Sequence, residues 1–205
     1  MHKQTETKIN LFIDKLDKSG VGISLMQNEN VCLVPYTLPG ERVKADIINK
    51  FKSKMYCSNL EILENSSERS HKTCEHFTKC GGCLLQHWQY ENYKQWKFNL
   101  IRQPLLKLTP DIKTLDMIST ENYSRRRAKF FLRQNNNSCR LGFKKYKSET
   151  LININKCIII DPEIMEFMSE VKNAFNKNFL TNEILIFHVN KLDYGLDILL
   201  SLIHI

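Results

Sequence analysis

The chain has 205 residues, of which 42% are apolar and 25% are charged, and its formal net charge is +8 at pH 7. This is ordinary globular composition, which excludes collagen, coiled coils and wholesale disorder. The longest nearly uncharged apolar stretch, Ile198 to Ile205, is far shorter than the roughly 20 residues of a membrane-spanning helix. The N-terminus carries no apolar secretory core. We therefore expect a cytoplasmic protein that does not bind a membrane.

The positive charge is concentrated in residues 123–147, which contain nine basic residues and no acidic residue. The rest of the chain sums to −1. A patch of one sign favours binding to a phosphate backbone, although a solvated hairpin with one basic face explains the charge equally well. The basic residues are Arg125, Arg126, Arg127, Lys129, Arg133, Arg140, Lys144, Lys145 and Lys147.

The N-terminal segment has the pattern of short strands. Apolar and polar residues alternate over residues 8–16, 21–26, 31–34 and 43–63, with turn residues between them. Four or five short strands in fewer than 60 residues, without a helical period, predict a small closed or nearly closed β-barrel in residues 1–65.

Polar residues 64–73 indicate a boundary, after which residues 66–205 form the predicted second domain. Within residues 86–107, apolar side chains such as Tyr93 and Trp96 recur at helical spacing, which predicts a helix with an aromatic face. Pro104 lacks a backbone N–H and is expected to kink or end this helix.

Strand patterns return from residue 126, and they place the basic segment on a β-hairpin. Asp161 and Pro162 are a helix cap and a first helical residue, which predicts a helix that ends at about residue 179. A final hairpin is expected from residue 184 to the end. The predicted fold class is therefore α+β.

Three of the seven cysteines, Cys74, Cys80 and Cys83, lie within ten residues, and two glycines separate the last two. Without an export signal, this spacing indicates metal binding rather than disulfides. Cys157 is the natural fourth ligand. Thiolate ligands suit zinc and iron–sulfur clusters about equally, but three clustered cysteines and one distant one are more typical of a cubane cluster. The competing fourth ligands are His71, His76 and His87.

Four segments of the chain carry a resemblance to a known family: residues 74–87 (CEHFTKCGGCLLQH), 123–129 (YSRRRAK), 141–145 (LGFKK) and 154–162 (INKCIIIDP). In this order they resemble the iron–sulfur-containing RNA (uracil-5-)-methyltransferases that modify ribosomal RNA. The first 63 residues are similar to the OB-like TRAM barrel that opens those enzymes.

This resemblance implies an α+β iron–sulfur domain after the barrel, with a 4Fe–4S cluster on Cys74, Cys80, Cys83 and Cys157. It implies RNA as the partner, with 23S rRNA expected, and S-adenosylmethionine as the methyl donor. Phe143 or Tyr146 is a candidate to stack on a base, although an aromatic residue in a hairpin lies more often in the core. The candidate RNA-binding residues are Arg125, Arg126, Arg127, Lys129, Arg140, Phe143, Lys144, Lys145 and Lys147.

The chain departs from the family in its motifs, since it shows no glycine-rich S-adenosylmethionine loop and no Ser-Cys-Asn-Pro segment. From this we expect that the Rossmann-like methyltransferase domain is absent. The chain would then be the truncated N-terminal half of the enzyme, inactive alone, and would use S-adenosylmethionine only if a separately encoded methyltransferase domain supplied the catalytic half. The alternatives are a stand-alone RNA-binding iron–sulfur protein without catalysis and a zinc-binding structural protein.

Overall fold

The computed structural model describes residues 8–71, 74–135, 138–178 and 184–203. The chain divides into two compact units, one of residues 1–72 and 84–117 and the other of residues 73–83 and 118–205. These described residues form eleven β-strands and two α-helices. The predicted α+β class is therefore wrong, because the chain is mostly β. Segments in which apolar and polar residues alternate, as in strands, cover far more of the chain than the two helical segments do.

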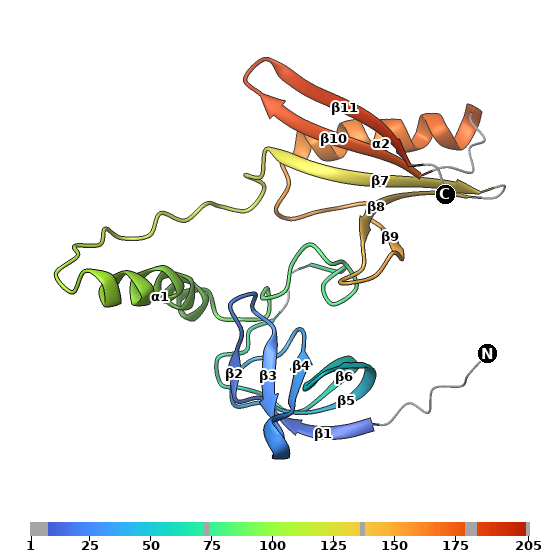
Figure 1. Cartoon of the computed structure of the whole chain (residues 1–205). Coiled ribbons are helices and arrows are strands. Elements are labelled where there is room, and N and C mark those ends of the chain that lie inside the picture. The colour runs from blue at the N-terminus through green and yellow to red at the C-terminus, as the bar shows by residue number, and fades with distance from the viewer. Residues whose placement is uncertain (1–7, 72–73, 136–137, 179–183, 204–205) are drawn as a thin grey trace. The chain divides into compact units, whose positions relative to one another are not determined.

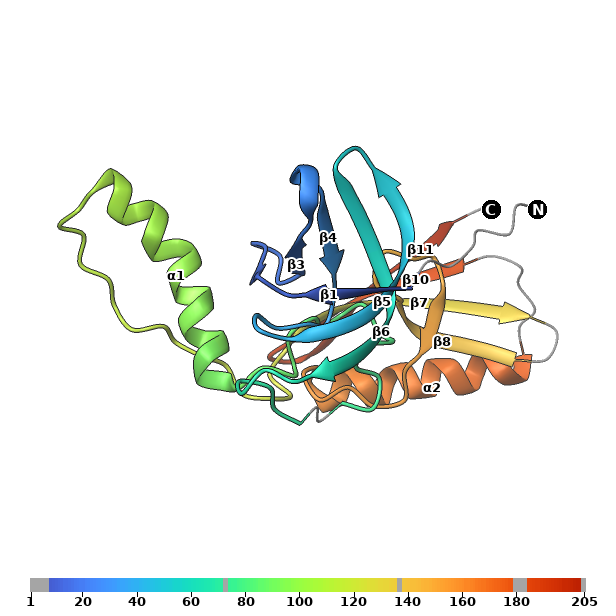
Figure 2. The same cartoon turned by 90° about the horizontal axis from the view of Figure 1, so that it is seen from below.

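The first unit contains a six-stranded sheet in the order β1-β5-β6-β4-β3-β2. Its two edges, β1 and β2, are separated in the chain only by Ile13 and Asp14. Because three extended residue steps cover at most about 11 Å, the sheet must curl until its edges lie close together (Figures 1 and 2). The strands are β1 (Lys8–Phe12), β2 (Lys15–Leu16), β3 (Gly22–Leu25), β4 (Val31–Val34), β5 (Arg42–Phe51) and β6 (Lys54–Glu64).

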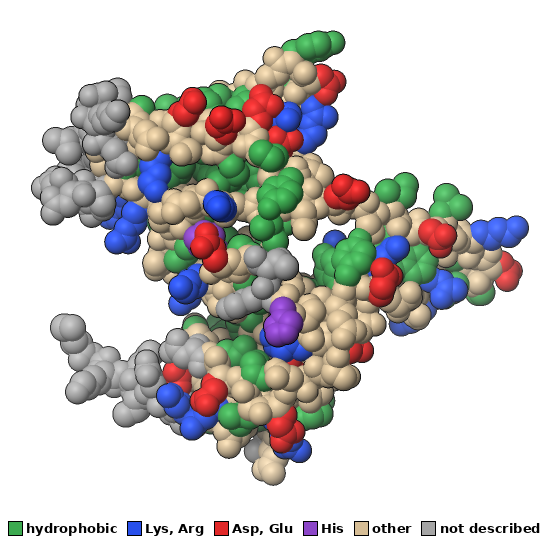
Figure 3. Space-filling view, turned by 180° about the vertical axis from the view of Figure 1, so that it is seen from behind, with side chains coloured by type: hydrophobic (Ala, Val, Ile, Leu, Met, Phe, Trp, Pro, Cys, Tyr) green, Lys and Arg blue, Asp and Glu red, His purple; other side chains and the backbone are tan. Residues whose placement is uncertain are grey.

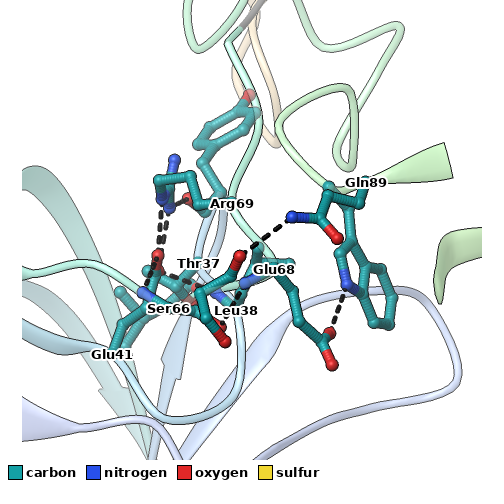
Figure 4. Close-up of polar contacts among 11 residues, drawn as sticks. Thr37, Leu38, Glu41, Ser66, Glu68, Arg69 and Gln89 are labelled. Atoms are coloured by element: carbon teal, nitrogen blue, oxygen red, sulfur yellow. Dashed lines mark hydrogen bonds and ion pairs between the residues drawn. The ribbon is translucent and has the colours of Figure 1, made fainter.

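A buried ion pair fastens the segment after β6 to the connection between β4 and β5 (Figure 4). The side chain of Glu41 is fully buried and accepts a hydrogen bond of 2.8 Å from Nη2 of Arg69. It also accepts hydrogen bonds from the backbone N–H groups of Leu38 at 2.9 Å and Ser66 at 3.3 Å. Burial alone would raise the pKa of Glu41, but these hydrogen bonds and the guanidinium outweigh it and hold the pKa below its usual value.

Helix α1 (Tyr90–Leu108) also belongs to the first unit. It continues through Pro104, so the expected stop at this residue is wrong. A proline removes one backbone donor, and the next turn still closes, since the N–H of Thr109 bonds to the carbonyl of Leu105 at 2.8 Å. Every residue of α1 is at least partly exposed, and Figure 3 shows apolar and charged side chains interspersed on its surface.

The chain enters α1 through anchored side chains. Nε1 of Trp88 donates a hydrogen bond of 2.7 Å to Glu68, and Nε2 of Gln89 donates one of 2.9 Å to the carbonyl of Ser67 (Figure 4). The Trp88 ring also lies 5.7 Å from that of Trp96 on the helix. These contacts connect the start of α1 to the segment that carries the buried ion pair.

The second unit is a five-stranded antiparallel sheet in the order β11-β10-β7-β8-β9, with helix α2 (Pro162–Asn178) packed on one face (Figure 1). As predicted, α2 begins at Pro162, and Oδ1 of Asp161 caps it by accepting a hydrogen bond of 3.0 Å from the N–H of Glu163. No helix in the described part of the chain is long and apolar enough to cross a membrane. The strands are β7 (Arg127–Asn135), β8 (Ser138–Lys144), β9 (Leu151–Asn153), β10 (Ile184–Leu192) and β11 (Gly195–Ile203).

Replacing Arg69 with methionine leaves the Glu41 carboxylate buried without its counter-ion, so the free energy of unfolding should fall by about 3–5 kcal/mol near neutral pH. Because the folded pKa of Glu41 lies below its unfolded value, the wild-type pair stabilises the fold above that value, and this contribution is lost as the pH falls through the folded pKa. The cost of Arg69→Met should therefore shrink as the pH falls.

Urea unfolding followed by tryptophan fluorescence measures this effect, since both tryptophans, Trp88 and Trp96, lie in the first unit. The matched control is Arg42→Met. Arg42 pairs with Glu64 at 3.2 Å, but their side chains are 61% and 67% exposed, so the loss should stay within about 1 kcal/mol. Equal losses in the two variants would contradict the assigned role of the buried pair.

Candidate functional site

The basic segment lies on strands β7 and β8 of the second unit, where residues alternate between the two faces of the sheet. Along β7, Arg127, Lys129 and Arg133 are exposed. The alternate residues are buried in the core beneath α2: Ala128, Phe130 and Leu132. Because alternate side chains of a strand point to opposite faces of the sheet, the charged side chains lie on one face and the core side chains on the other. The sheet therefore has a basic face opposite α2.

The basic face extends onto β8. Arg133 pairs across the strands with Arg140, which is also exposed, and Phe131 pairs with Gly142. The partly exposed ring of Phe131 thus lies among cations, with Nζ of Lys129 5.2 Å and Nζ of Lys144 4.7 Å from its centroid. We define the basic face by the side chains of Arg127, Lys129, Phe131, Arg133, Arg140 and Lys144.

Phe143, a sequence candidate for base stacking, points to the other side of the sheet. Its ring stacks on Phe130 at a centroid distance of 4.9 Å and packs against the core. This placement corrects the expectation, because the alternation along β8 gives Phe143 the orientation of its core neighbour Leu141. Sequence reasoning missed Phe131, which the same alternation, counted from Lys129, places on the basic face.

The three consecutive arginines have different surroundings. Arg126 donates a hydrogen bond of 2.6 Å to Asp193, and Nε of Arg127 donates one of 2.8 Å to Oδ1 of Asn190. These contacts connect the start of β7 to β10 and the turn before β11. Arg125 is exposed. All three guanidinium groups lie at the surface, but that of Arg126 already has a carboxylate partner.

The remaining candidate lysines lie at the end of β8 and in the connection to β9. Lys144 forms an ion pair with the exposed Glu149. Lys145 and Lys147 are exposed, and Nζ of Lys147 lies 5.5 Å from the centroid of the Tyr146 ring. This connection adds positive charge beside the basic face.

The cysteine loop, residues 73–83, groups with the second unit although the segments on both sides of it belong to the first. Its backbone is held by a hydrogen bond of 3.0 Å from the N–H of Gly81 to the carbonyl of Lys144. Within the loop, the N–H of Cys80 bonds to the carbonyl of His76 at 2.8 Å, and the N–H of Gly82 lies 3.4 Å from Sγ of Cys80.

The structure brings Cys157 near this loop. Burial raises the pKa of the Cys80 thiol, and the thiols of Cys157 and Cys74 raise it further by repulsion, while the N–H of Gly82 opposes them. Cys83 is half-buried at the end of the same loop. No group of three or more His, Cys, Asp or Glu side chains in the described segments is arranged to hold a metal ion. Within the described residues, Cys157 and Cys74 therefore act on Cys80 without a metal-binding arrangement of three or more ligands.

The histidines differ in their surroundings. His87 is buried in the first unit, where burial, aided by the positive charge of Arg69, lowers its pKa to about 4 and keeps it neutral near pH 7. Nε2 of His76 lies 3.3 Å from a carboxylate oxygen of Glu75. His71 is exposed. Cys157, the expected fourth ligand, interacts with the thiol of Cys80.

No family model matches this chain. Its curated relatives are RNA methyltransferases. An uncharacterized RNA methyltransferase of Brucella melitensis is 32% identical over 162 residues, which are 79% of this chain and 38% of that protein. The 23S rRNA (uracil(1939)-C(5))-methyltransferase RlmD of Shewanella denitrificans is 30% identical over 182 residues, 85% of this chain and 38% of that protein. The chain thus spans less than two fifths of the length of these relatives.

Among solved structures, the chain is similar to the Pyrococcus abyssi tRNA (uracil-54, C5)-methyltransferase in complex with S-adenosyl-L-homocysteine. The TM-score is 0.61 at 18% sequence identity, and the match covers 94% of this chain and 45% of that one. This match to a methyltransferase fold contradicts the expectation of an absent methyltransferase domain. A motif search finds residue types at fixed spacing and does not detect a fold, and the expectation failed for that reason.

Gly81→Ala should loosen the cysteine loop, because the added Cβ would lie 2.8 Å from both the carbonyl oxygen of Lys144 and the backbone nitrogen of Tyr146. Overpacking against backbone costs about 1–3 kcal/mol, so the amide of residue 81 should exchange its hydrogen roughly 5- to 150-fold faster. Hydrogen exchange read by mass spectrometry measures this change. Gly82→Ala is the control, since its nearest neighbour is Sγ of Cys80 at 3.4 Å. Similar exchange in both variants would show that the loop does not depend on this close approach.

Proposed function

We propose that this chain acts in the S-adenosylmethionine-dependent methylation of carbon 5 of a uracil in RNA, and that its second unit binds the RNA through the basic face. The observation that carries the proposal is the separation of faces on β7, where Arg127 and Lys129 are exposed opposite a buried core. The names of the relatives support the reaction and the class of substrate. Such a substrate is consistent with activity in the cytoplasm. We expect the RNA to be 23S rRNA, because the Shewanella denitrificans relative is named as a 23S rRNA methyltransferase.

The chemistry of this reaction explains why a dedicated RNA-binding surface is useful. Carbon 5 of uracil is a poor nucleophile until a thiol adds at carbon 6, and a base must leave its stack before an enzyme can reach it. The methyl group comes from S-adenosylmethionine when this cofactor is bound. Holding the strand on both sides of the target base requires several phosphate contacts, and Arg127 and Lys129 lie two residues apart on β7, which is a spacing of about 7 Å.

We further propose that Cys74, Cys80, Cys83 and Cys157 hold a 4Fe–4S cluster. Their chemistry fits, because soft thiolates suit iron–sulfur clusters and zinc. The interaction of Cys157 and Cys74 with Cys80 supports the choice of ligands. Bound there, the cluster would connect the loop to the segment before α2 and hold the RNA-binding unit rigid. A structural zinc ion is the alternative that elemental analysis separates from it.

Replacing Arg127, Lys129 and Arg140 together with glutamine should weaken RNA binding and flatten its salt dependence. All three side chains are exposed on the basic face, so their loss should leave the core intact. The slope of log Kd against log salt should fall by about 0.7 for each lost contact with a single-strand phosphate. Fluorescence anisotropy with a labelled uridine-containing RNA, repeated at several salt concentrations, gives this slope.

The control removes the same charge from the first unit by replacing the exposed lysines Lys97, Lys107 and Lys113 with glutamine. This control should keep most of the wild-type slope. If the basic-face variant and the control change the slope equally, binding follows net charge alone and the basic face is not the RNA site. If the wild-type chain binds no RNA, the proposed function is wrong.

Cys157→Ser should abolish or destabilise the cluster. Protein purified without oxygen should be brown and contain about four irons and four sulfides per chain, and the serine variant should lose most of both. Iron, sulfide and zinc analysis with an absorption spectrum measures the outcome. Cys139→Ala is the control, because Cys139 is a buried core residue of the same unit and should leave iron content unchanged. Stoichiometric zinc without sulfide, or no metal, would overturn the cluster proposal.

A further inference from the structure

Phe131 is the aromatic residue of the basic face, and its ring is partly exposed. Its partner across β8 is Gly142, which has no side chain. Glycine is required there because a Cβ would lie 2.2 Å from the carbonyl oxygen of Ile152 on β9. On the other side the partner of Phe131 is Ile186 of β10, which is buried. Across the strands the ring therefore has an apolar neighbour on one side and a residue without a side chain on the other.

The charges around this ring fit a nucleic acid rather than an apolar ligand. The ammonium groups of Lys129 and Lys144 lie within 5.2 Å of the ring centroid, on long flexible stems. Arg133 and Arg140 extend the positive charge along the same face. A base could stack on the ring while the lysines turn to the phosphates on either side, because an ammonium binds phosphate as a mobile point charge.

Among the described residues, two carboxylates of the strands and connections around this face have a partner. Glu149 pairs with Lys144, and Asp197 of β11 accepts a hydrogen bond of 3.1 Å from Asn190. Neither carboxylate is among the residues directly opposite Phe131. The charged groups that lie over the ring are the ammonium groups of Lys129 and Lys144.

We propose that the basic face is a binding platform for single-stranded RNA, with one base stacked on Phe131 and the flanking phosphates bound by Lys129 and Lys144. This inference rests on the proposed RNA-binding function. It adds that the bound RNA is single-stranded and that Phe131 contacts one of its bases. A duplex keeps its bases inside the stack, so it offers phosphates to this face but no base to Phe131.

Phe131→Leu tests the platform, because leucine keeps an apolar side chain beside the cross-strand partner Ile186 and removes the aromatic ring. Binding of a labelled single-stranded RNA of about 12 nucleotides should weaken at least about fivefold, while binding of the matching duplex should change little. Phe131→Tyr keeps the ring and should retain wild-type affinity for the single strand. Tyr194→Leu is the control for loss of a fully exposed aromatic residue in the same unit and should leave affinity unchanged.

Photo-crosslinking gives an independent readout of position. The wild-type chain is irradiated with bound RNA that carries 5-iodouridine in place of uridine. We expect a covalent crosslink at Phe131, which mass spectrometry of the digested complex would locate. Unchanged single-strand affinity in Phe131→Leu, or equal weakening in the leucine and tyrosine variants, would overturn the platform. If the variant of Arg127, Lys129 and Arg140 weakens binding while Phe131→Leu does not, the proposed function stands and the platform alone is wrong.

Discussion

Packing of α2 on one face of the five-stranded sheet is the interaction on which the second unit depends. Ile164 and Met168 of α2 are fully buried against Phe130 and Leu132 of β7. The face under α2 buries the apolar side chains that stabilise the unit. Because side chains alternate along each strand, the residues of the other face do not need to be apolar. That freedom allows a row of cations at a density that a buried surface could not tolerate, because unpaired buried charges are costly. The core therefore permits the basic face.

The cysteine loop illustrates a second constraint, the close approach of two backbones. Gly81 lies where a side chain would collide with the β8–β9 connection, and its N–H bonds to the carbonyl of Lys144. Lys144 also places its ammonium over Phe131. One residue thus contacts the cysteine loop through its backbone and the basic face through its side chain. Order in the loop and the position of a cation on the basic face are connected by this short segment.

The first unit is stabilised differently, by a carboxylate and a guanidinium buried together. The Glu41–Arg69 pair spans 28 positions in the sequence, and it fastens the segment after β6 to the connection before β5. Such a pair contributes little net free energy compared with apolar packing, but it accepts only one arrangement of its partners. It therefore helps to specify the path by which the chain leaves the curled sheet and enters α1.

Local chemistry determined much of this protein from sequence alone: the capped start of α2 at Pro162, the final hairpin, the clustered cysteines and the concentration of charge in residues 123–147. These features depend on residues close together in the chain, so spacing reveals them. Tertiary structure decided that Phe131 rather than Phe143 lies on the basic face, that Cys157 approaches the cysteine loop, and that Arg69 neutralises Glu41. Each of these depends on which strands pair and which face the helix covers, and that choice is set by burial over the whole unit rather than by any local pattern.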